Sequence, residues 1–520
     1  MKKVCCFLLI LAVVLGLCGC RKAEESLSHR EQDAVSEKSR DDLTLLYCNG
    51  DSLNPYAART EVNRQLGALL YEPLVRVNDR FEPEYRLAQS VAVDGKNCTV
   101  VLKEIAFWDG SAVTADDVVY SYQLAKASAE YAAALYEVQS ASSTDGKTVL
   151  FRLTQYDPYF ANLLDFPVIK AGSEKQTDAD GVILPPVGCG RYCPDGNAAL
   201  KRNEGYYGEK SRISSIQLIN APDRESVSHY VEVGAVDLYF TDIADGNIVR
   251  MSGKRLEVNM NHLVYLGING AISGLSEPYL RYAISSALDR SEICNAAYFN
   301  NATPAEGFFH PDFGATKSLQ TIKKSADLQI AIENLGKIGY NNLDREGYRC
   351  NAGGKPLTLT LLVNNDNPSR LSAARMIVRQ LKAAGIAVSL LERDYASYVA
   401  AVQANQFQLY LGEVKILNNM DFTQLVVPGG SAAFGVTPRT ATSEETVPTE
   451  NTEPQPTPLS DIIAGFYSGT QTVSDLAGAL LTEMPVIPVC YRKGLLFYSA
   501  DLRSVTSATP SDLFLSMAQF

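Results

Sequence analysis

Between residues 357 and 412, strand-like and helix-like stretches of apolar residues follow one another along the chain. Residues 357–363 alternate in a way typical of a β-strand, and Pro368 precedes a stretch with helical character. Gly385 follows that stretch at the position where glycine commonly ends a helix. The order of elements predicts right-handed crossovers and a parallel sheet. The predicted elements are strands 357–363, 386–391 and 407–411, and helices 369–384 and 395–404.

A second set of patterned segments lies near the start of the chain. Residues 99–102 are apolar and mostly β-branched, as in strands, and Asp109-Gly110 is typical of a tight turn. Thr114 stands where a helix N-cap belongs, and Asp117, three residues later, approximates a capping box. The sequence therefore predicts a strand, a turn and a capped helix here. Other predicted elements are strands 43–47, 91–94 and 98–103, and a helix over 61–70.

The rest of the chain adds further helices and strands. Leu280, Ile284, Ala287 and Leu288 fall on one helical face, which predicts an amphipathic core helix. Strands are expected over 265–269 and 484–491, and a helix over 459–467. Residues 436–458 are rich in Thr, Glu and Pro and nearly free of apolar residues, which predicts a disordered surface insertion.

The N-terminus is patterned for export. Lys2 and Lys3 precede an apolar stretch from Val4 to Leu17, which is too short to span a bilayer comfortably. The sequence Leu17-Cys18-Gly19-Cys20 resembles a lipobox, so residues 1–19 are expected to be a lipoprotein signal peptide and Cys20 to carry the lipid. The alternative is a secretory signal that happens to end in Cys. Residues 20–42 then form a polar, flexible tether, which places the mature protein on the extracytoplasmic face of the cell membrane.

Composition narrows the class of protein. The chain has 520 residues, enough for two or three lobes, and a net charge of −12. Without Lys2 and Lys3, 45 basic and 59 acidic residues remain, a net charge of −14. An acidic protein is a poor partner for nucleic acid, whose binding depends on neutralising phosphates. Nucleic acid is therefore not an expected partner.

No enzyme or metal motif is found. The sequence lacks a Walker loop, a His-Glu-x-x-His motif and a Gly-x-Ser-x-Gly motif, so neither catalytic residues nor a cofactor are predicted. The four His are scattered, which argues against a metal site. Seven cysteines follow the lipobox, an odd number, so at least one is unpaired in a monomer. Their pairing is left open: Cys48, Cys98, Cys189, Cys193, Cys294, Cys350 and Cys490.

Several phrases of this sequence resemble one protein family. Residues 107–122 read Phe-Trp-Asp-Gly-Ser-Ala-Val-Thr-Ala-Asp-Asp-Val-Val-Tyr-Ser-Tyr, which resembles the signature of the family-5 extracellular solute-binding proteins of ABC importers. Residues 186–192 resemble that family's Pro-Val-Gly-x-Gly-x-Tyr turn, and residues 233–238 resemble its Gly-x-Val-Asp-Leu strand. The resemblance covers about residues 43–435 and 459–510.

The resemblance implies an α/β, bilobed, periplasmic-binding-protein-like fold with an extra second lobe, that is, three domains that close at a hinge. Lobe I would comprise residues 43–70, 187–262 and 486–520, and lobe II residues 71–186. Lobe III would comprise residues 263–485, including the insertion. The ligand would lie in the cleft between the lobes.

The sequence departs from the family pattern at the ligand contacts. In peptide-binding members an Asp in a Trp-x-x-Asp-Tyr phrase holds the ligand's amino group, but that phrase is absent here and Leu417 falls near the expected position. Glu413 or Asp421 are candidates to replace it; alternatively they are solvated, or pair with Lys415. The further candidates are Asn418 in the same segment and Tyr56, Tyr265 and Tyr491 at expected lobe junctions, with core packing as the alternative for the tyrosines.

The predicted function is that of a lipid-anchored, monomeric receptor that captures a solute, expected to be a peptide, and delivers it to ABC permease and ATPase subunits. Without the Asp phrase, a nickel chelate or a sugar remains open as the ligand. The other hypotheses are a peptide-sensing surface receptor, an extracellular hydrolase, which the absence of motifs disfavours, and a passive surface protein.

Overall fold

The computed structural model describes residues 41–196, 198–243, 249–319, 321–437, 457–502 and 505–520. The predicted signal peptide, Cys20, nearly all of the tether and most of the insertion at 436–458 lie outside the described residues. The chain divides into a unit of residues 1–42 and a unit of residues 43–520. The helices, the core and the pocket of the described residues belong to the second unit.

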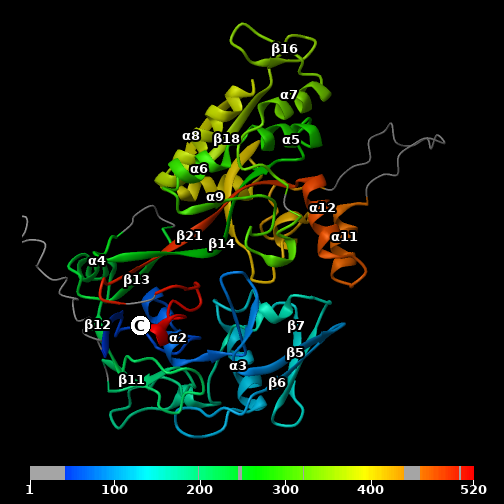
Figure 1. Cartoon of the computed structure of the whole chain (residues 1–520). Coiled ribbons are helices and arrows are strands. Elements are labelled where there is room, and N and C mark those ends of the chain that lie inside the picture. Colours follow the sequence, from blue (N-terminus) through cyan, green and yellow to red (C-terminus); the bar gives the residue numbers. More distant parts are fainter. Residues whose placement is uncertain (1–40, 197, 244–248, 320, 438–456, 503–504) are drawn as a thin grey trace, which may run out of the picture. The chain divides into compact units, whose positions relative to one another are not determined.

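Two small sheets in the described chain come mainly from its first half (Figure 1). One has the strand order β1–β12–β11–β10, with bounds Asp42–Tyr47, Ser215–Asn220, Ala199–Arg202 and Tyr192–Pro194. The other is antiparallel with the order β5–β6–β8–β7, with bounds Ala88–Asp94, Asn97–Leu102, Thr148–Leu153 and Val138–Ser143. Short pairs join β2 (Glu72–Pro73) to β9 (Pro167–Val168) and β3 (Val75–Val77) to β4 (Pro83–Tyr85).

The two helices of this half that the sequence predicted are present. Helix α2 spans Glu61–Leu70, as predicted, and buries Leu66, Leu69 and Leu70. Helix α3 (Ala115–Ala127) begins with the predicted capping box: the Thr114 amide donates to Asp117 Oδ2 at 2.9 Å, and the Asp117 amide donates to Thr114 Oγ1 at 3.4 Å. Both predictions are confirmed, and the capping box of α3 could be predicted because it depends on residues three apart.

A seven-stranded mixed sheet dominates the rest of the chain. Its main path is β13–β21–β14–β20–β18–β19, with β15 paired to β21. Strands β18, β19 and β20 are parallel, as the sequence predicted, whereas β14 runs antiparallel to β20. The bounds are Leu238–Thr241, Val486–Tyr498, Lys254–Ile268, Leu409–Lys415, Thr358–Asn364 and Ala387–Arg393, with β15 at Ala302–Pro304.

Helices cover both faces of this sheet (Figure 1). Leu361 and Leu409 lie in one hydrophobic cluster, and Leu362 and Tyr410 lie in the other, as the twofold alternation of strands requires. The first cluster contains α5 to α8 (Pro278–Ala287, Arg290–Ala296, Leu328–Lys337 and Pro368–Ala383). The second contains α9 to α12 (Tyr395–Gln403, Thr423–Val426, Leu459–Phe466 and Val473–Glu483). The remaining elements are α4 (Arg224–Glu232), β16 (Asn342–Leu343), β17 (Arg349–Cys350) and 3-10 turns η1 to η4 (Phe160–Leu163, Ser173–Lys175, Gly314–Thr316 and Met517–Gln519).

Two long strands connect the cores of the molecule. The first part of β14 contributes Val258 and Met260 to the cluster that holds α2, and its second part contributes Val264 and Leu266 to the cluster of the large sheet. The pairing of β14 with β21 shifts register between Asn259 and Leu263. The expected lobe boundary at 262–263 thus falls inside a continuous strand, next to this irregularity.

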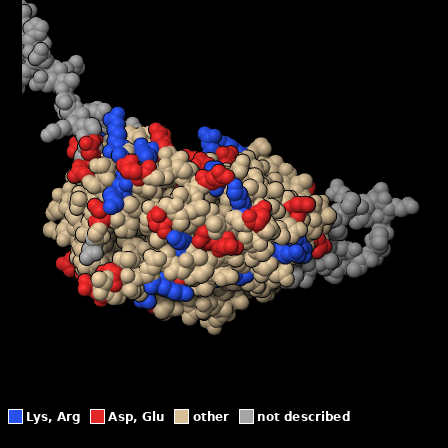
Figure 2. Space-filling model, turned by 90° about the horizontal axis from the view of Figure 1, so that it is seen from below, with Lys and Arg blue, Asp and Glu red and all other residues tan. Residues whose placement is uncertain are grey.

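The surface face in Figure 2 has no patch of one charge sign, and the described cysteines form no disulfide. On the face in Figure 2, acidic and basic side chains are interspersed and neither sign forms a continuous patch. The seven cysteines after the lipobox are unpaired, including Cys189 and Cys193. Among the described helices, none is long and apolar enough to cross a membrane.

Candidate functional site

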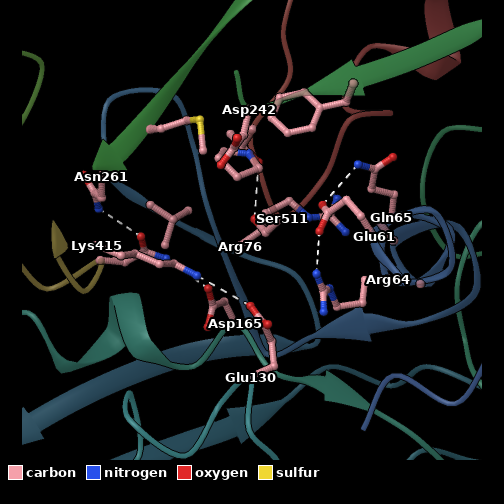
Figure 3. Close-up of a pocket in the computed structure, with 18 of the residues that line it drawn as sticks. Glu61, Arg64, Gln65, Arg76, Glu130, Asp165, Asp242, Asn261, Lys415 and Ser511 are labelled. Carbon is pink, nitrogen blue, oxygen red and sulfur yellow. Dashed lines mark hydrogen bonds and ion pairs between the residues drawn. The ribbon is translucent and has the colours of Figure 1, made fainter. Parts of the chain in front are cut away.

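A pocket of about 650 Å³ lies between α2, the middle of β14 and the segment that follows β20 (Figure 3). This volume is within the range of about 300–1,000 Å³ that small-molecule sites occupy. Its lining carries charges of both signs beside apolar and aromatic side chains. The charged residues in it are Glu61, Arg64, Arg76, Asp79, Glu130, Asp165, Arg224, Asp242 and Lys415, with His262 beside them.

Helix α2 supplies one wall of the pocket. Arg64 Nη2 lies 2.6 Å from Glu61 Oε2, and Gln65 Nε2 donates to Glu61 Oε1 at 3.1 Å. The end of this helix is held by close backbone packing, because the Gly190 amide donates to the Leu70 carbonyl at 3.0 Å. A Cβ on Gly190 would lie 2.3 Å from the Leu69 carbonyl oxygen, so only glycine fits there. The Gly-x-Gly turn thus positions the pocket wall.

A buried ion-pair network lies beneath the pocket. Arg76 contacts Asp512 at 2.6 Å and Glu72 at 3.1 Å, and Arg191 contacts Asp512 at 2.6 Å. Burial would raise the pKa of Asp512, but the charges of Arg191 and Arg76 lower it to about 2. The guanidinium of Arg76 is therefore neutralised within the protein, although Arg76 lines the pocket.

A second corner of the pocket gathers Glu130, Asp165 and Lys415 (Figure 3). Lys415 Nζ lies 3.5 Å from Glu130 Oε1, and Asn418 Nδ2 donates to Asp165 Oδ2 at 3.0 Å. Burial raises the pKa of Asp165 to about 6, and Lys415 and Asn418 only partly offset this. The buried surroundings of Asp165 thus disfavour the charged form of its carboxylate.

Glu413 lies behind the pocket lining, in a cluster of its own. Its carboxylate is 2.7 Å from Arg370 Nη2, 2.6 Å from Arg492 Nη2 and 3.3 Å from His262 Nδ1. Burial alone would raise the pKa of Glu413, but the His262 hydrogen bond and the two arginines lower it well below its usual range. The Glu413 carboxylate is therefore bound within the protein by two arginines and a histidine. Lys415 pairs with Glu130 and not with Glu413.

The other predicted site residues are dispersed. Asn418 lines the pocket, whereas Asp421 accepts from the Thr423 amide at 2.8 Å and is not part of the lining. The hydroxyl of Tyr56 donates to the Pro167 carbonyl, and its ring packs on Tyr131, which does line the pocket. Two further tyrosines are buried and bonded within the protein: Tyr265 to the Tyr410 hydroxyl at 3.0 Å, and Tyr491 to the Phe308 carbonyl.

Sequence reasoning missed Asp165, Glu130 and Arg64. For Asp165 a signal was present, because it is a charged residue between Leu164 and Phe166, both fully buried. Carboxylates are rare between buried apolar residues, so such a position indicates a structural or functional role. Glu130 and Arg64 stand in ordinary polar contexts and carried no comparable signal.

The arrangement can bind and orient a solute but offers no reacting centre. No group of three or more His, Cys, Asp or Glu within the described ranges is placed to hold a metal ion. A pocket with charges of both signs, beside strand β14 that joins separate cores, is typical of a solute-binding protein of mixed α/β fold.

The chain belongs to the bacterial extracellular solute-binding proteins, family 5: residues 82–425 match the family's middle region. Proteins of this family bind solutes for ABC transporters and are not enzymes, as the sequence analysis predicted. The family assignment from residues 107–122 is likewise confirmed.

Individual relatives are distant. The oligopeptide-binding protein AppA of Bacillus subtilis (strain 168) is 22% identical over 404 residues, which cover 73% of this chain and 74% of AppA. The glutathione-binding protein GsiB of Salmonella typhi is 22% identical over 464 residues, covering 86% of this chain and 84% of GsiB. The crystal structure of a nickel ABC transporter protein from Bacillus halodurans superposes with a TM-score of 0.68 at 20% identity, covering 91% of this chain and 97% of that one. These likenesses establish the fold, and the α/β binding-protein prediction is confirmed.

Proposed function

We propose that this protein is the solute receptor of an ABC importer and that it captures a zwitterionic, peptide-like solute in the pocket. The observation that carries this proposal is the presence of both charge signs at two separate corners of the pocket. One corner holds Glu61 with Arg64 on α2. The other holds Asp165 with Glu130 and Lys415, at the end of β20. A ligand with an amino and a carboxyl group complements such a lining. AppA and GsiB, named for oligopeptide and glutathione binding, support this choice of ligand class.

The structure suggests how capture would proceed. Water is displaced from the pocket on binding, so each charged group of the solute needs a fixed partner. Closure would occur at β14 and β21, the strands that join the core containing α2 to the core of the large sheet. No bond is made or broken, and the closed complex would be delivered to the permease and ATPase subunits.

The location of the receptor follows from the N-terminal pattern. We propose that Cys20 carries a lipid and that the polar segment to residue 42 tethers a monomeric receptor to the extracytoplasmic membrane face. Substituting Cys20→Ala should release the protein into the detergent-free soluble fraction and abolish its metabolic labelling by fatty acid. Membrane retention of the variant would overturn this part of the proposal.

Native mass spectrometry tests the ligand class directly. Protein starting after Cys20 is sprayed under native conditions, and the solute released by denaturation is identified. Release of peptides, or thermal stabilisation by a mixed peptide library, is expected. Release of a metal chelate or a sugar, with no response to peptides, would overturn the peptide assignment and leave the family assignment intact.

A further inference from the structure

The carboxylates of the pocket differ in how their charge is balanced. Glu61 is paired with Arg64 at 2.6 Å, Glu130 with Lys415 at 3.5 Å and Asp242 with Arg492 at 3.6 Å. Asp79 is exposed to solvent. In the described part of the chain, Asp165 has no cationic group within ion-pair distance, and its carboxylate accepts a hydrogen bond from the neutral amide of Asn418.

Asp165 is fixed in place by its neighbours. It lies between the 3-10 turn η1 and strand β9, and the side chains before and after it, Leu164 and Phe166, are both 0% exposed. The backbone at this point is therefore anchored in the core on both sides. A half-buried carboxylate held there with no cation at ion-pair distance costs free energy, because the more distant Lys415 offsets only part of the burial, and a cationic ligand group would offset the rest.

Asn418 is itself oriented by two other amides. Asn261 Nδ2 donates to Asn418 Oδ1 at 3.1 Å, which leaves Asn418 Nδ2 to donate to Asp165. Asn162 Nδ2 donates to the Asn418 carbonyl at 3.1 Å and to the Phe81 carbonyl at 2.9 Å. The amide that faces Asp165 is thus fixed in both position and direction.

A second observation concerns the same corner. Asn261 lines the pocket, is only 6% exposed, and its Oδ1 has no hydrogen-bond partner among the described residues. A buried acceptor left unpaired is costly and calls for a donor. Within the described chain, Asn261 Oδ1 therefore lacks a donor and Asp165 lacks a cation at ion-pair distance, and a cationic group of a bound solute would supply both.

We propose that Asp165 binds a cationic group of the solute, a primary ammonium or a guanidinium, and that Asn418 is the positioning residue that orients it. This inference rests on the proposed function, since it presumes that the pocket is the solute site. The corner carries two carboxylates and one ammonium, Asp165, Glu130 and Lys415, so a single positive charge on the solute neutralises it. In this proposal the corner recognises the positive charge of the solute group and its hydrogen-bond donors, and not the length of a peptide chain.

Asp165→Asn tests the charge while keeping the shape. Binding is measured by thermal shift and calorimetry with two probes, a mixed library of tri- to pentapeptides with free amino groups and the same library after N-acetylation. The wild-type protein should bind the free-amine library at least tenfold more tightly, and D165N should lose that preference. Glu392→Gln, which alters a carboxylate paired with Arg375 at 3.0 Å and outside the pocket lining, is the matched control and should keep the preference.

Asn418→Ala separates positioning from charge. This variant should bind the free-amine library more weakly than wild type but still prefer it over the acetylated library, because the Asp165 carboxylate remains. A merely structural role would change both libraries equally. Circular dichroism and melting temperature verify that each variant is folded.

A panel of non-peptide cations keeps the inference distinct from the peptide assignment. It contains diamines, guanidinium compounds and single amino acids. Binding of a member to wild type but not to D165N upholds the role of Asp165 even where peptides fail to bind. Equal binding of acetylated and free libraries, an unaltered preference in D165N, or no response of wild type to any probe overturns it.

Discussion

At the residue scale, the buried charges of this protein fall into two kinds. Glu413 is surrounded by Arg370, Arg492 and His262, so its pKa is lowered. Asp157 and Asp165 instead accept hydrogen bonds from neutral amides, and burial raises the pKa of each to about 6. The first kind stabilises the fold as an ion-pair cluster, and the second kind costs stability at neutral pH.

Glu413→Gln should be strongly destabilising. Removing one partner of a buried ion cluster leaves Arg370 without its countercharge and Arg492 with Asp242 at 3.6 Å, and breaking a buried pair typically costs about 3–5 kcal/mol. The free energy of unfolding from urea denaturation measures the effect. Glu61→Gln, at a solvent-accessible pair, should cost less than about 1 kcal/mol. Similar losses in the two variants would contradict the structural role of Glu413.

The pH dependence of stability should follow the two aspartates. Their pKa values of about 6 in the folded state lie above the ordinary Asp value of 3.8, so folding takes up protons between these pH values. The free energy of unfolding should therefore rise as the pH falls from 7 towards about 5. Below about pH 4 it should fall again, because Glu413 and Asp512, whose pKa values are lowered, become protonated in the unfolded chain.

The substitution Asp157→Asn tests whether Asp157 contributes to this change of the free energy of unfolding with pH. The variant should be more stable than wild type at pH 7 and show about half the change between pH 7 and pH 5, since Asp165 alone remains to titrate. Denaturation curves at these two pH values supply the comparison. A slope equal to that of wild type would show that Asp157 does not titrate in this range.

At the element scale, local chemistry made the elements predictable. The α2 bounds and the Thr114–Asp117 capping box are set by residues close in sequence, and both predictions are confirmed. Strand β20 was expected at 407–411 but spans Leu409–Lys415, and β21 continues beyond the predicted Tyr491 to Tyr498. Pairing with β14 extends these strands, and pairing partners are not visible in a local pattern.

The pocket could not be predicted in the same way. Arg370 and Arg492 lie 43 and 79 residues from Glu413, so the ion cluster was invisible in the sequence. The family resemblance indicated the segment that follows β20, and Asn418 from that segment lines the pocket. Glu130 and Asp165 reach the same corner from segments more than 250 residues away in the chain. Only the tertiary fold brings these groups together.

Gly190→Ala should damage the α2 wall of the pocket. Its Cβ would lie 2.3 Å from the Leu69 carbonyl oxygen, an atom of the backbone that cannot rotate away. A loss of about 1–3 kcal/mol is expected from such overpacking, together with weaker solute binding. Gly478→Ala is the control: nothing lies within 4 Å of its Cβ in helix α12, so it should be neutral or stabilising by up to about 1 kcal/mol. A melting temperature for G190A equal to that of wild type would contradict the close packing.

At the scale of the whole molecule, the pocket is flanked by a direct contact between two distant segments. Asn419 Nδ2 donates to Asp157 Oδ2 at 2.8 Å, and both residues are buried. Beside them the Tyr156 amide donates to the Tyr467 carbonyl at 3.1 Å, and Tyr159 stacks on Phe466. These contacts join residues 156–165 to the helices and loops of the large sheet. Under the proposed closure, they form when the pocket closes on the solute.

Asn419→Ala should weaken the closed state while leaving the pocket lining unchanged, because Asn419 is not among the lining residues. A hydrogen bond to a charged group contributes about 1.5–3 kcal/mol, so the solute should dissociate roughly tenfold faster. Association should change little, because under the proposed closure this contact forms only after the solute has entered. Stopped-flow measurement of both rates with the free-amine peptide library tests this. Asn341→Ala, at an exposed amide far along the chain, is the control and should leave both rates unaltered. A variant N419A that changes only the association rate would mean that the contact forms before the solute enters, and that closure is not linked to capture.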